Sequence, residues 1–272
     1  MHNGARTLQR CIDSVSGQSY EQKELLIMDG GSSDGTIDIL RANAGKISYW
    51  ESKPDRGICH AWNKAVDHSN GDWICFLGAD DFFWQPDVLQ RMVPKLAELE
   101  LNMRLAYGQV AIVDEMGKIL DVSGSPWSEA KRHLCYMPVP HTGMMHRRSL
   151  FKERGRFDES FHIAGDYEFL LRELKKNDAF FITDIIVVGM EFGGVSSTPR
   201  NTLRLLREWA RARWNNGLRP INGTWIKAYA RAFLRNMASD LLGERRLRRL
   251  AIRFGRLLGR PSAWEKFSKK EE

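Results

Sequence analysis

Two adjacent carboxylates, Asp80 and Asp81, follow an apolar run in the segment WICFLGADDFF (residues 73–83). Like charges side by side repel each other, so we expect a basic side chain or a metal ion beside them. The alternative is a pair of solvated loop residues. Because the flanking residues are strongly apolar, we favour a functional site over an ordinary exposed turn.

Two further acidic residues follow predicted strands: Asp29 in IMDGGSSDGT and Asp55 in SKPDRGI. In open α/β sheets, ligands bind beyond the carboxyl ends of the strands. Carboxylates gathered there can bind ribose hydroxyls, base N–H groups or a divalent cation. The competing interpretation makes Asp29 and Asp34 turn and cap residues. Taken together with Asp80 and Asp81, these positions predict one acid-lined site.

The elements that must position these acids alternate along the chain. Apolar spacing predicts helices over 7–15, 37–41, 58–68 and 86–99, and strands over 24–28, 47–50, 73–77, 105–113 and 180–190. Residues 112–122 predict a hairpin around DEMGK. Strands separated by helices indicate an α/β fold with a mostly parallel sheet flanked by helices.

The ordered motifs NGARTLQRCIDSV, ELLIMDGGSSDGTIDIL, SYWESKPDRGICHAWNKAV and GDWICFLGADDFF resemble the family 2 glycosyltransferases, over about residues 3–194. The resemblance implies the Rossmann-like GT-A fold and a bacterial polysaccharide-type, inverting enzyme. It implies that Asp29 contacts the uracil or ribose of a nucleotide sugar. It further implies that Asp81 binds Mg²⁺ or Mn²⁺, with Asp80 nearer the ribose or the water shell of the metal.

The chemistry of sugar transfer fits these residue types independently of the resemblance. Charge builds on the leaving diphosphate, and a carboxylate-bound metal neutralises it. A second carboxylate, remote from the metal, must take the proton from the acceptor hydroxyl. Asp166 in HIAGDYEFLLREL is our candidate, since the segment resembles the family's paired-acid motif with Gly165 in place of the first acid. The alternative role for Asp166 is a helix N-cap.

Basic and polar residues nearby are candidates for holding the diphosphate or the acceptor. Arg56 lies beside Asp55, and Lys64 lies in the following predicted helix. The segment PHTGMMHRRSLF (residues 140–151) matches an acceptor-side segment of the family. We therefore assign His141 and Arg147 to the acceptor side. The alternative is that the histidines and arginines of this segment are ordinary surface or interdomain residues.

The start of the chain departs from the family pattern. Family members begin with an apolar strand and a turn that lines the uracil pocket, whereas this sequence opens on MHNG. We therefore expect the catalytic domain, residues 1–199, to lack its first strand. That expectation and Gly165 favour a second hypothesis, a degenerate glycosyltransferase acting as a non-catalytic, membrane-associated scaffold. The presence of Asp29, Asp80, Asp81 and Asp166 opposes it.

Composition limits the classes of protein. Apolar residues make up 43% and charged residues 28% of the 272, an ordinary globular balance. No apolar run approaches the roughly 20 residues that cross a bilayer. The four cysteines have no CxxC spacing, which predicts reduced thiols in a cytoplasmic protein rather than a zinc site.

The positive charge is concentrated in residues 200–272, which hold 19 Lys and Arg against 6 Asp and Glu, while the preceding residues hold 22 against 28. We expect an Arg-rich helical extension, with apolar stripes at Trp225, Tyr229, Phe233, Met237 and Leu241 and again over 247–258. A basic amphipathic helix is typical of segments on anionic lipid, so we predict peripheral contact with the inner face of the plasma membrane through 225–260. The alternative is packing on the catalytic domain or on a second subunit. No motif predicts nucleic-acid binding, and the oligomeric state stays open.

The sequence therefore predicts an inverting glycosyltransferase that uses a nucleotide sugar, expected to be UDP-linked. The acceptor would be a saccharide or a lipid-linked sugar in cell-surface polysaccharide or glycolipid assembly. A nucleotidyltransferase is the further alternative, but it requires a basic triphosphate-binding loop that the sequence does not show. A dinucleotide-binding domain is disfavoured because DGGSSDG does not match GxGxxG.

Overall fold

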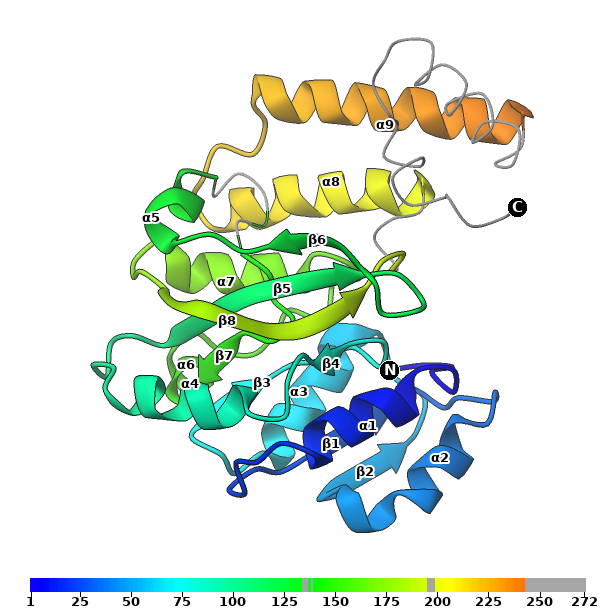
Figure 1. Cartoon of the computed structure of the whole chain (residues 1–272). Helices are drawn as coiled ribbons and strands as arrows, with labels where there is room; N and C mark the ends of the chain where they lie inside the picture. The colour runs from blue at the N-terminus through cyan, green and yellow to red at the C-terminus, as the bar shows by residue number, and fades with distance from the viewer. Residues whose placement is uncertain (134–136, 138, 195–198, 243–272) are drawn as a thin grey trace.

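The computed structural model describes residues 1–133, 137, 139–194 and 199–242 (Figure 1). In chain order its elements are α1 (Leu8–Ser16), β1 (Leu26–Asp29), α2 (Thr36–Ala42), η1 (Ala44–Lys46), β2 (Tyr49–Ser52), α3 (Ile58–His68), β3 (Trp73–Cys75), β4 (Phe82–Phe83), α4 (Val88–Ala97), β5 (Leu105–Val113), β6 (Ile119–Ser123), α5 (Trp127–Ala130), η2 (Lys131–His133), β7 (Met145–Arg147), α6 (Ser149–Glu153), α7 (Gly165–Leu174), β8 (Phe180–Glu191), α8 (Pro199–Asn215) and α9 (Gly223–Leu242).

The predicted α/β fold is confirmed, but the sheet is mixed rather than mostly parallel. Strands β1 and β2 form a parallel pair, and β3-β7-β5-β8-β4 form a second sheet with β6 on β5. In that sheet β5 and β8 run parallel, while the β3–β7, β4–β8, β5–β6 and β5–β7 pairs are antiparallel. Antiparallel pairs need no helical crossover. The two-residue β4 and three-residue β7 can therefore enter the sheet directly from loops, which periodicity does not reveal.

The first residues of the chain lie against the end of β1. The amino group of Met1 donates to the carbonyl of Met28 (2.7 Å), and the N–H of Gly30 donates to the carbonyl of Met1 (2.7 Å). The N–H of Asn3 donates to Ser32 Oγ (2.6 Å). No strand in the described part of the chain joins β1 to β3. The absence of a first strand from the catalytic domain stays a prediction.

Amphipathic helices cover the sheets as their apolar spacing predicts. On α1, which apolar spacing predicts over 7–15, the apolar residues Leu8, Cys11, Ile12 and Val15 are all buried. The largest core cluster includes residues of α3, α6 and α7 and of the strands β3 and β5. Cys11, Cys59 and Cys75 are free thiols, and Cys135 lies outside the described residues. The core thus fixes the helix starts and strand ends from which the acidic loops extend.

The Arg-rich segment begins with two stacked helices (Figure 1). Helix α8 packs on α7, and its Ala212 belongs to the main core. Helix α9 lies outside α8, with Trp225, Tyr229 and Ala232 on the face that meets it. Among the helices of the described ranges, none combines the length and the hydropathy that a membrane span requires. The division into 1–199 and 200–272 stays a prediction, and the repeated stripe over 247–258 lies outside the described residues.

Candidate active site

The loop after β1 and the loop after β2 meet at the first two acidic positions. Because β1 and β2 are parallel and pair Asp29 with Ser52, both loops leave the same edge. A Cβ added at Gly30 would lie 2.8 Å from Asp55 Oδ2, so the two loops are in direct contact. Asp55 also accepts a hydrogen bond from the N–H of Gly57 (2.9 Å), which fixes the turn into α3. The structure thus brings Asp29 and Asp55 together.

Asp29 is held as a buried anion with 0% exposure. Its carboxylate accepts hydrogen bonds from the hydroxyls of Ser32 (2.5 Å) and Ser52 (2.6 Å) and from the N–H groups of Gly31 and Ser32. Burial opposes ionisation, but these donors outweigh it and leave the pKa of Asp29 lowered. The carboxylate therefore stays ionised and rigid, which suits recognition of N–H or O–H donors.

The Asp80–Asp81 pair converges over Gly78, just after β3. A Cβ added at Gly78 would lie 2.5 Å from Asp80 Oδ1 and 3.1 Å from Asp81 Oδ2. Only glycine leaves that space free for both carboxylates. Asp81 is 5% exposed, whereas Asp80 is half-buried. The pair therefore presents one enclosed and one accessible carboxylate on the same side of the turn.

The burial of Asp81 is only partly offset by hydrogen bonds. Burial raises the pKa of Asp81 to about 6, against the opposing effect of donors from Thr142 (2.5 Å) and Gly78 (2.8 Å). Within the described residues both hydrogen bonds end on Oδ2, so Oδ1 keeps its lone pairs for another ligand. A cation at this position would offset the cost of burying the charge.

The donor set at Gly78 fits Mg²⁺ or Mn²⁺. No group of three or more His, Cys, Asp and Glu in the described ranges could hold a metal alone. Mg²⁺ in nucleotide sites is typically held by one or two carboxylates, with substrate phosphates and water completing the octahedron. The two carboxylates at residues 80 and 81 match that requirement.

Asp166 lies in the first turn of α7. Its Oδ1 accepts a hydrogen bond from the N–H of Tyr167 (2.7 Å), and the N-cap position itself is Ala164. Burial, together with the nearby charge of Glu208, raises the pKa of Asp166 to about 6 against the backbone hydrogen bonds that lower it. A carboxyl group with such a pKa is well matched to accepting a proton near neutral pH.

The glycine before Asp166 has a packing cause. A Cβ added at Gly165 would lie 2.2 Å from Cys59 Sγ, well inside van der Waals contact. Cys59, in the first turn of α3, is buried and fills the space that a side chain at residue 165 requires. The helix starts of α3 and α7 therefore touch, and Asp166 lies next to the loop that contains Asp55.

Two further contacts tie the acidic loops into one group. Arg56 forms an ion pair with Glu159 (2.6 Å), which joins the 53–57 loop to the loop before α7. At the other side, a Cβ added at Gly4 would lie 3.0 Å from Ala79 Cβ, and Arg10 donates to the carbonyl of Asp80 (3.0 Å). The first ten residues of the chain, which hold the loop after β1, thus also contact the turn that contains Asp80 and Asp81.

His141 belongs to an aromatic cluster rather than to an open surface. Its ring lies 4.9 Å from Trp62 and 5.4 Å from Phe76, centroid to centroid, and is buried. Burial, with a smaller contribution from His146, lowers its pKa well below the ordinary value, so the ring is neutral. The adjacent residue Thr142 contacts Asp81, so His141 backs the acid pair from inside the core. Its acceptor-side role stays a prediction.

Arg147 and Lys64 are engaged elsewhere. Arg147 pairs with Trp73 at the start of β3 and donates to the carbonyls of Leu99 (3.1 Å) and Met103 (3.3 Å). The acid pair follows the other end of β3, so the structure does not bring Arg147 to it. Lys64 forms an ion pair with Glu51 (2.6 Å).

One acidic residue near Asp166 escaped the sequence analysis. Glu208, on α8, is 7% exposed and accepts hydrogen bonds from the N–H groups of His162, Ile163 and Ala164. It is the single acidic residue of a helix whose arginines dominate the charge count. In the sequence, the signal that could have identified Glu208 was a single acidic residue within an arginine-rich helix.

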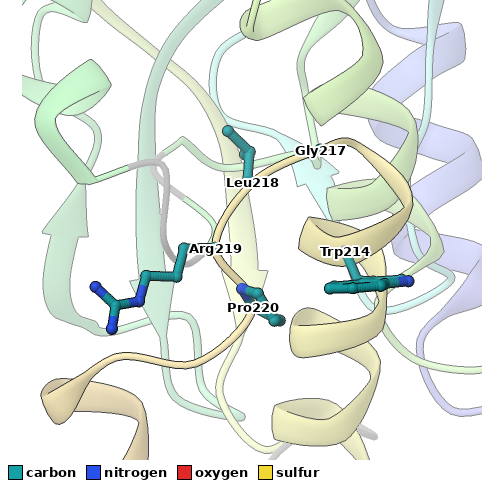
Figure 2. A pocket seen from close by; sticks show the side chains of 5 residues that line it. All are labelled: Trp214, Gly217, Leu218, Arg219 and Pro220. Atoms are coloured by element: carbon teal, nitrogen blue, oxygen red, sulfur yellow. The ribbon is translucent and has the colours of Figure 1, made fainter.

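A shallow pocket of about 410 Å³ lies at the C-terminal end of α8, lined by Trp214, Gly217, Leu218, Arg219 and Pro220. Figure 2 shows Trp214 projecting from the helix end beside the loop that continues to Pro220. The lining has no carboxylate and includes none of the predicted site residues. We therefore assign the candidate active site to the acidic loops.

Comparison with known proteins defines the class. The model of glycosyl transferase family 2 matches residues 1–120. A PGL/p-HBAD biosynthesis glycosyltransferase of Mycobacterium tuberculosis is 31% identical over 210 residues, covering 72% of this chain and 76% of the relative. An uncharacterized glycosyltransferase of the same species is 33% identical over 168 residues, covering 61% and 63%.

Solved structures agree on the fold. The S. aureus TarS fragment 1–349 in complex with UDP-GlcNAc superposes with a TM-score of 0.61 at 17% identity, covering 88% of this chain and 71% of that one. The match spans 42% of the longer TarS chain. Mannosyltransferase PcManGT from Pyrobaculum calidifontis, in complex with GDP-Man and Mn²⁺, gives 0.59 at 18% identity, covering 95% and 78%. The chain belongs to glycosyl transferase family 2. It is a glycosyltransferase with the GT-A fold.

Proposed function

We propose that this glycosyltransferase transfers a sugar from a nucleotide-sugar donor to a saccharide or lipid-linked acceptor, with inversion at the anomeric carbon. The donor is a UDP-sugar, and the product belongs to cell-surface polysaccharide or glycolipid. The mycobacterial relative named for PGL/p-HBAD biosynthesis supports the acceptor class. The TarS complex with UDP-GlcNAc supports the donor class.

The observation that carries this proposal is the convergence of four acidic positions, one at the end of β1, two in loops and one in the first turn of α7. Asp29 and Asp55 touch through Gly30, and the turn before Asp81 contacts the segment that holds the Asp29 loop. Asp166 joins them through the contact between Gly165 and Cys59. Acids gathered beyond strand ends of an α/β sheet fit a nucleotide-sugar site.

Each acid has a distinct role in the proposed reaction. Asp29 and Asp55 accept hydrogen bonds from the nucleoside, for which the fixed Asp29 anion is suited. Asp81 and Asp80 hold Mg²⁺ or Mn²⁺, which when bound neutralises charge on the leaving diphosphate. Asp166 takes the proton of the acceptor hydroxyl as that oxygen attacks the face opposite the diphosphate. This opposite-face attack inverts the anomeric configuration.

The test is a panel of UDP- and GDP-sugars with Mn²⁺, using the full chain, in which turnover and nucleotide release are measured. For the donor that turns over, NMR of the product should show the anomeric configuration opposite to that of the donor. Asp166→Asn should bind the donor with unchanged affinity and lose transfer by on the order of 100-fold or more, the range of general-base contributions. Transfer at the wild-type rate would remove Asp166 from the mechanism.

The scaffold alternative makes a different prediction for the same assay, since it expects donor binding without turnover. Its sequence support was the expected absence of the first strand together with the glycine in place of the first motif acid. The contact with Cys59 gives Gly165 a packing role that does not require loss of catalysis. Because the chain belongs to glycosyl transferase family 2, we do not propose the nucleotidyltransferase alternative.

We further propose that this cytoplasmic enzyme contacts the inner face of the plasma membrane through α9. The predicted stripe is divided: Trp225 and Tyr229 pack towards α8, whereas Phe233 and Met237 are exposed. Ile226 and Leu234 are also exposed and, at helical spacing, extend that outward face. Lys227 and Arg231 adjoin it and are exposed. An apolar face bordered by cations suits anionic lipid.

Sedimentation with vesicles of phosphatidylglycerol and phosphatidylcholine tests the contact. Replacing Phe233 and Leu234 by Glu removes two apolar groups worth about 1.5–3 kcal/mol each when buried. Binding should therefore fall by at least about tenfold. Leu101→Glu, at an apolar residue after α4 that is even more exposed than Phe233 and Leu234, is the control and should bind as wild type. Undiminished binding by the double variant would refute the role of α9.

A further inference from the structure

The loop before Asp166 is held from outside by a carboxylate of another helix. Glu208 Oε2 accepts hydrogen bonds from the N–H groups of Ile163 (2.9 Å) and Ala164 (2.9 Å), and both its oxygens lie 3.2 Å from the N–H of His162. Three successive backbone donors thus end on one side chain. The contact spans more than 40 residues of sequence, so it is a feature of tertiary structure.

These donors belong to the start of α7, which has no side-chain cap of its own. The first N–H groups of a helix have no partner within it, and a negative charge there is favourable. Glu208 supplies both the acceptor and the charge, and Arg204 donates to its Oε1 (3.1 Å). The carboxylate stays ionised: burial opposes this, but the hydrogen bonds leave the pKa of Glu208 lowered.

A second contact from α8 reinforces the same loop. Arg211 donates to the carbonyl of Ser160 (2.9 Å), and its guanidinium lies 3.7 Å from the centroid of the Phe161 ring. Residues 208 and 211 are three apart and therefore share one face of α8. That face holds residues 160–164, immediately before the catalytic candidate.

We propose that Glu208 is a positioning residue for the transfer reaction, which orients Asp166 by fixing the start of α7 and places a fixed negative charge beside it. This inference rests on the proposed role of Asp166 as the general base. Two effects follow. The fixed loop limits how far the Asp166 carboxylate can move, and the charge disfavours a second anion nearby, so Asp166 binds its proton more tightly.

Two substitutions separate these effects. Glu208→Gln removes the charge but keeps one acceptor oxygen for the backbone donors, whereas Glu208→Ala removes both. Arg207→Gln is the matched control, since it also changes the charge of α8 by one but contacts Tyr229 of α9 instead of the loop. Thermal unfolding establishes that each variant is folded before kinetics are compared.

In full-chain assays with the active nucleotide sugar and Mn²⁺, both Glu208 variants should keep the wild-type KM for the donor and lose kcat. The loss should be larger for Glu208→Ala, up to on the order of 100-fold, the cost of misplacing a catalytic group by about 1 Å. Glu208→Gln should also move the acid limb of the kcat profile to lower pH. Arg207→Gln should change neither.

The other charged and titratable groups around this loop are unchanged in these variants: they are Arg56, Cys59, His60, Asp158, Glu159, His162, Arg172, Arg204 and Arg211. A wild-type kcat and pH profile for both Glu208 variants, with Asp166→Asn inactive, would overturn this inference and leave the proposed function intact. Wild-type transfer by Asp166→Asn would instead refute the proposed base. The two failures are therefore distinguishable.

Discussion

Replacing Asp166 by Asn should make the protein more stable at alkaline pH while removing the proposed catalytic carboxylate. The pKa of Asp166 is raised from 3.8 to about 6, chiefly by burial. Because the folded-state pKa lies above the unfolded value, the stability present below pH 3.8 is lost as the pH rises through 6. An Asn side chain does not titrate, so the variant escapes this loss.

The size of the effect follows from the two pKa values. One pKa unit corresponds to about 1.4 kcal/mol, so the full penalty at pH 8 is at most about 3 kcal/mol. At pH 4.5 about 1 kcal/mol of it is already present, which leaves about 2 kcal/mol to develop by pH 8. Since the side chain is half-buried and water screens its charge, we expect about 1–2 kcal/mol.

Urea unfolding of wild type and Asp166→Asn at pH 4.5 and pH 8 measures this difference. The stability advantage of the variant should grow by about 1–2 kcal/mol between the two pH values. Asp38→Asn is the control, because Asp38 is 81% exposed on α2 and should give a change below about 0.5 kcal/mol. The reasoning would be refuted if the stability difference between the variant and the wild type were independent of pH, or if the wild type became the more stable of the two at pH 8.

Three further predictions concern packing and ligand geometry. Gly165→Ala should destabilise the fold by about 1–3 kcal/mol, measured by urea unfolding, because the added methyl group overpacks against Cys59 Sγ. Cys59→Ala in the same chain should restore part of that loss. Equal losses of stability with and without the Cys59 change would contradict the contact. Thr142→Val removes the hydroxyl that donates to Asp81 and should weaken Mn²⁺ affinity by about 10–100-fold, measured by calorimetry. Undiminished Mn²⁺ affinity would show that this hydrogen bond does not orient the Asp81 carboxylate. Arg147→Ala should lower the stability by about 1–3 kcal/mol and leave donor affinity unchanged, because its guanidinium donates to the carbonyls of Leu99 and Met103, at the end of β3 remote from the acid pair. A selective loss of donor affinity would instead support a donor-side role.

The local sequence pattern was sufficient to predict the long helices and strands. The predicted spans of α3 (Ile58–His68) and β5 (Leu105–Val113) agree with the structure to the residue. Both have strong apolar periodicity and clear flanking turns, so local preference and tertiary packing agree. The direction of the short strands β4 and β7 was not predictable, because two or three residues hold no period and their partners are distant in sequence.

The site residues also divide into those that the local sequence predicts and those that depend on tertiary structure. Asp29 and the Asp80–Asp81 pair were recognisable because each follows an apolar run; the structure places Asp29 at the end of β1 and the pair in the turn between β3 and β4. Gly165 was recognised as a departure, but its cause is Cys59, more than 100 residues earlier. Glu208 was hidden by the net charge of its helix, since a charge count averages over faces. His141 entered an aromatic cluster that only the tertiary structure assembles.

Metal-dependent nucleotide binding at the Asp80–Asp81 turn is the central claim, and calorimetric titration of UDP into the full chain tests it most directly. The titration is run with Mn²⁺ and with EDTA, for wild type, Asp81→Ala and the control Asp121→Ala on exposed β6. We predict that wild type and Asp121→Ala bind UDP more tightly with Mn²⁺ than with EDTA, by at least about tenfold. Asp81→Ala should lose that enhancement while staying folded. An equal Mn²⁺ enhancement in Asp81→Ala and wild type would contradict the account.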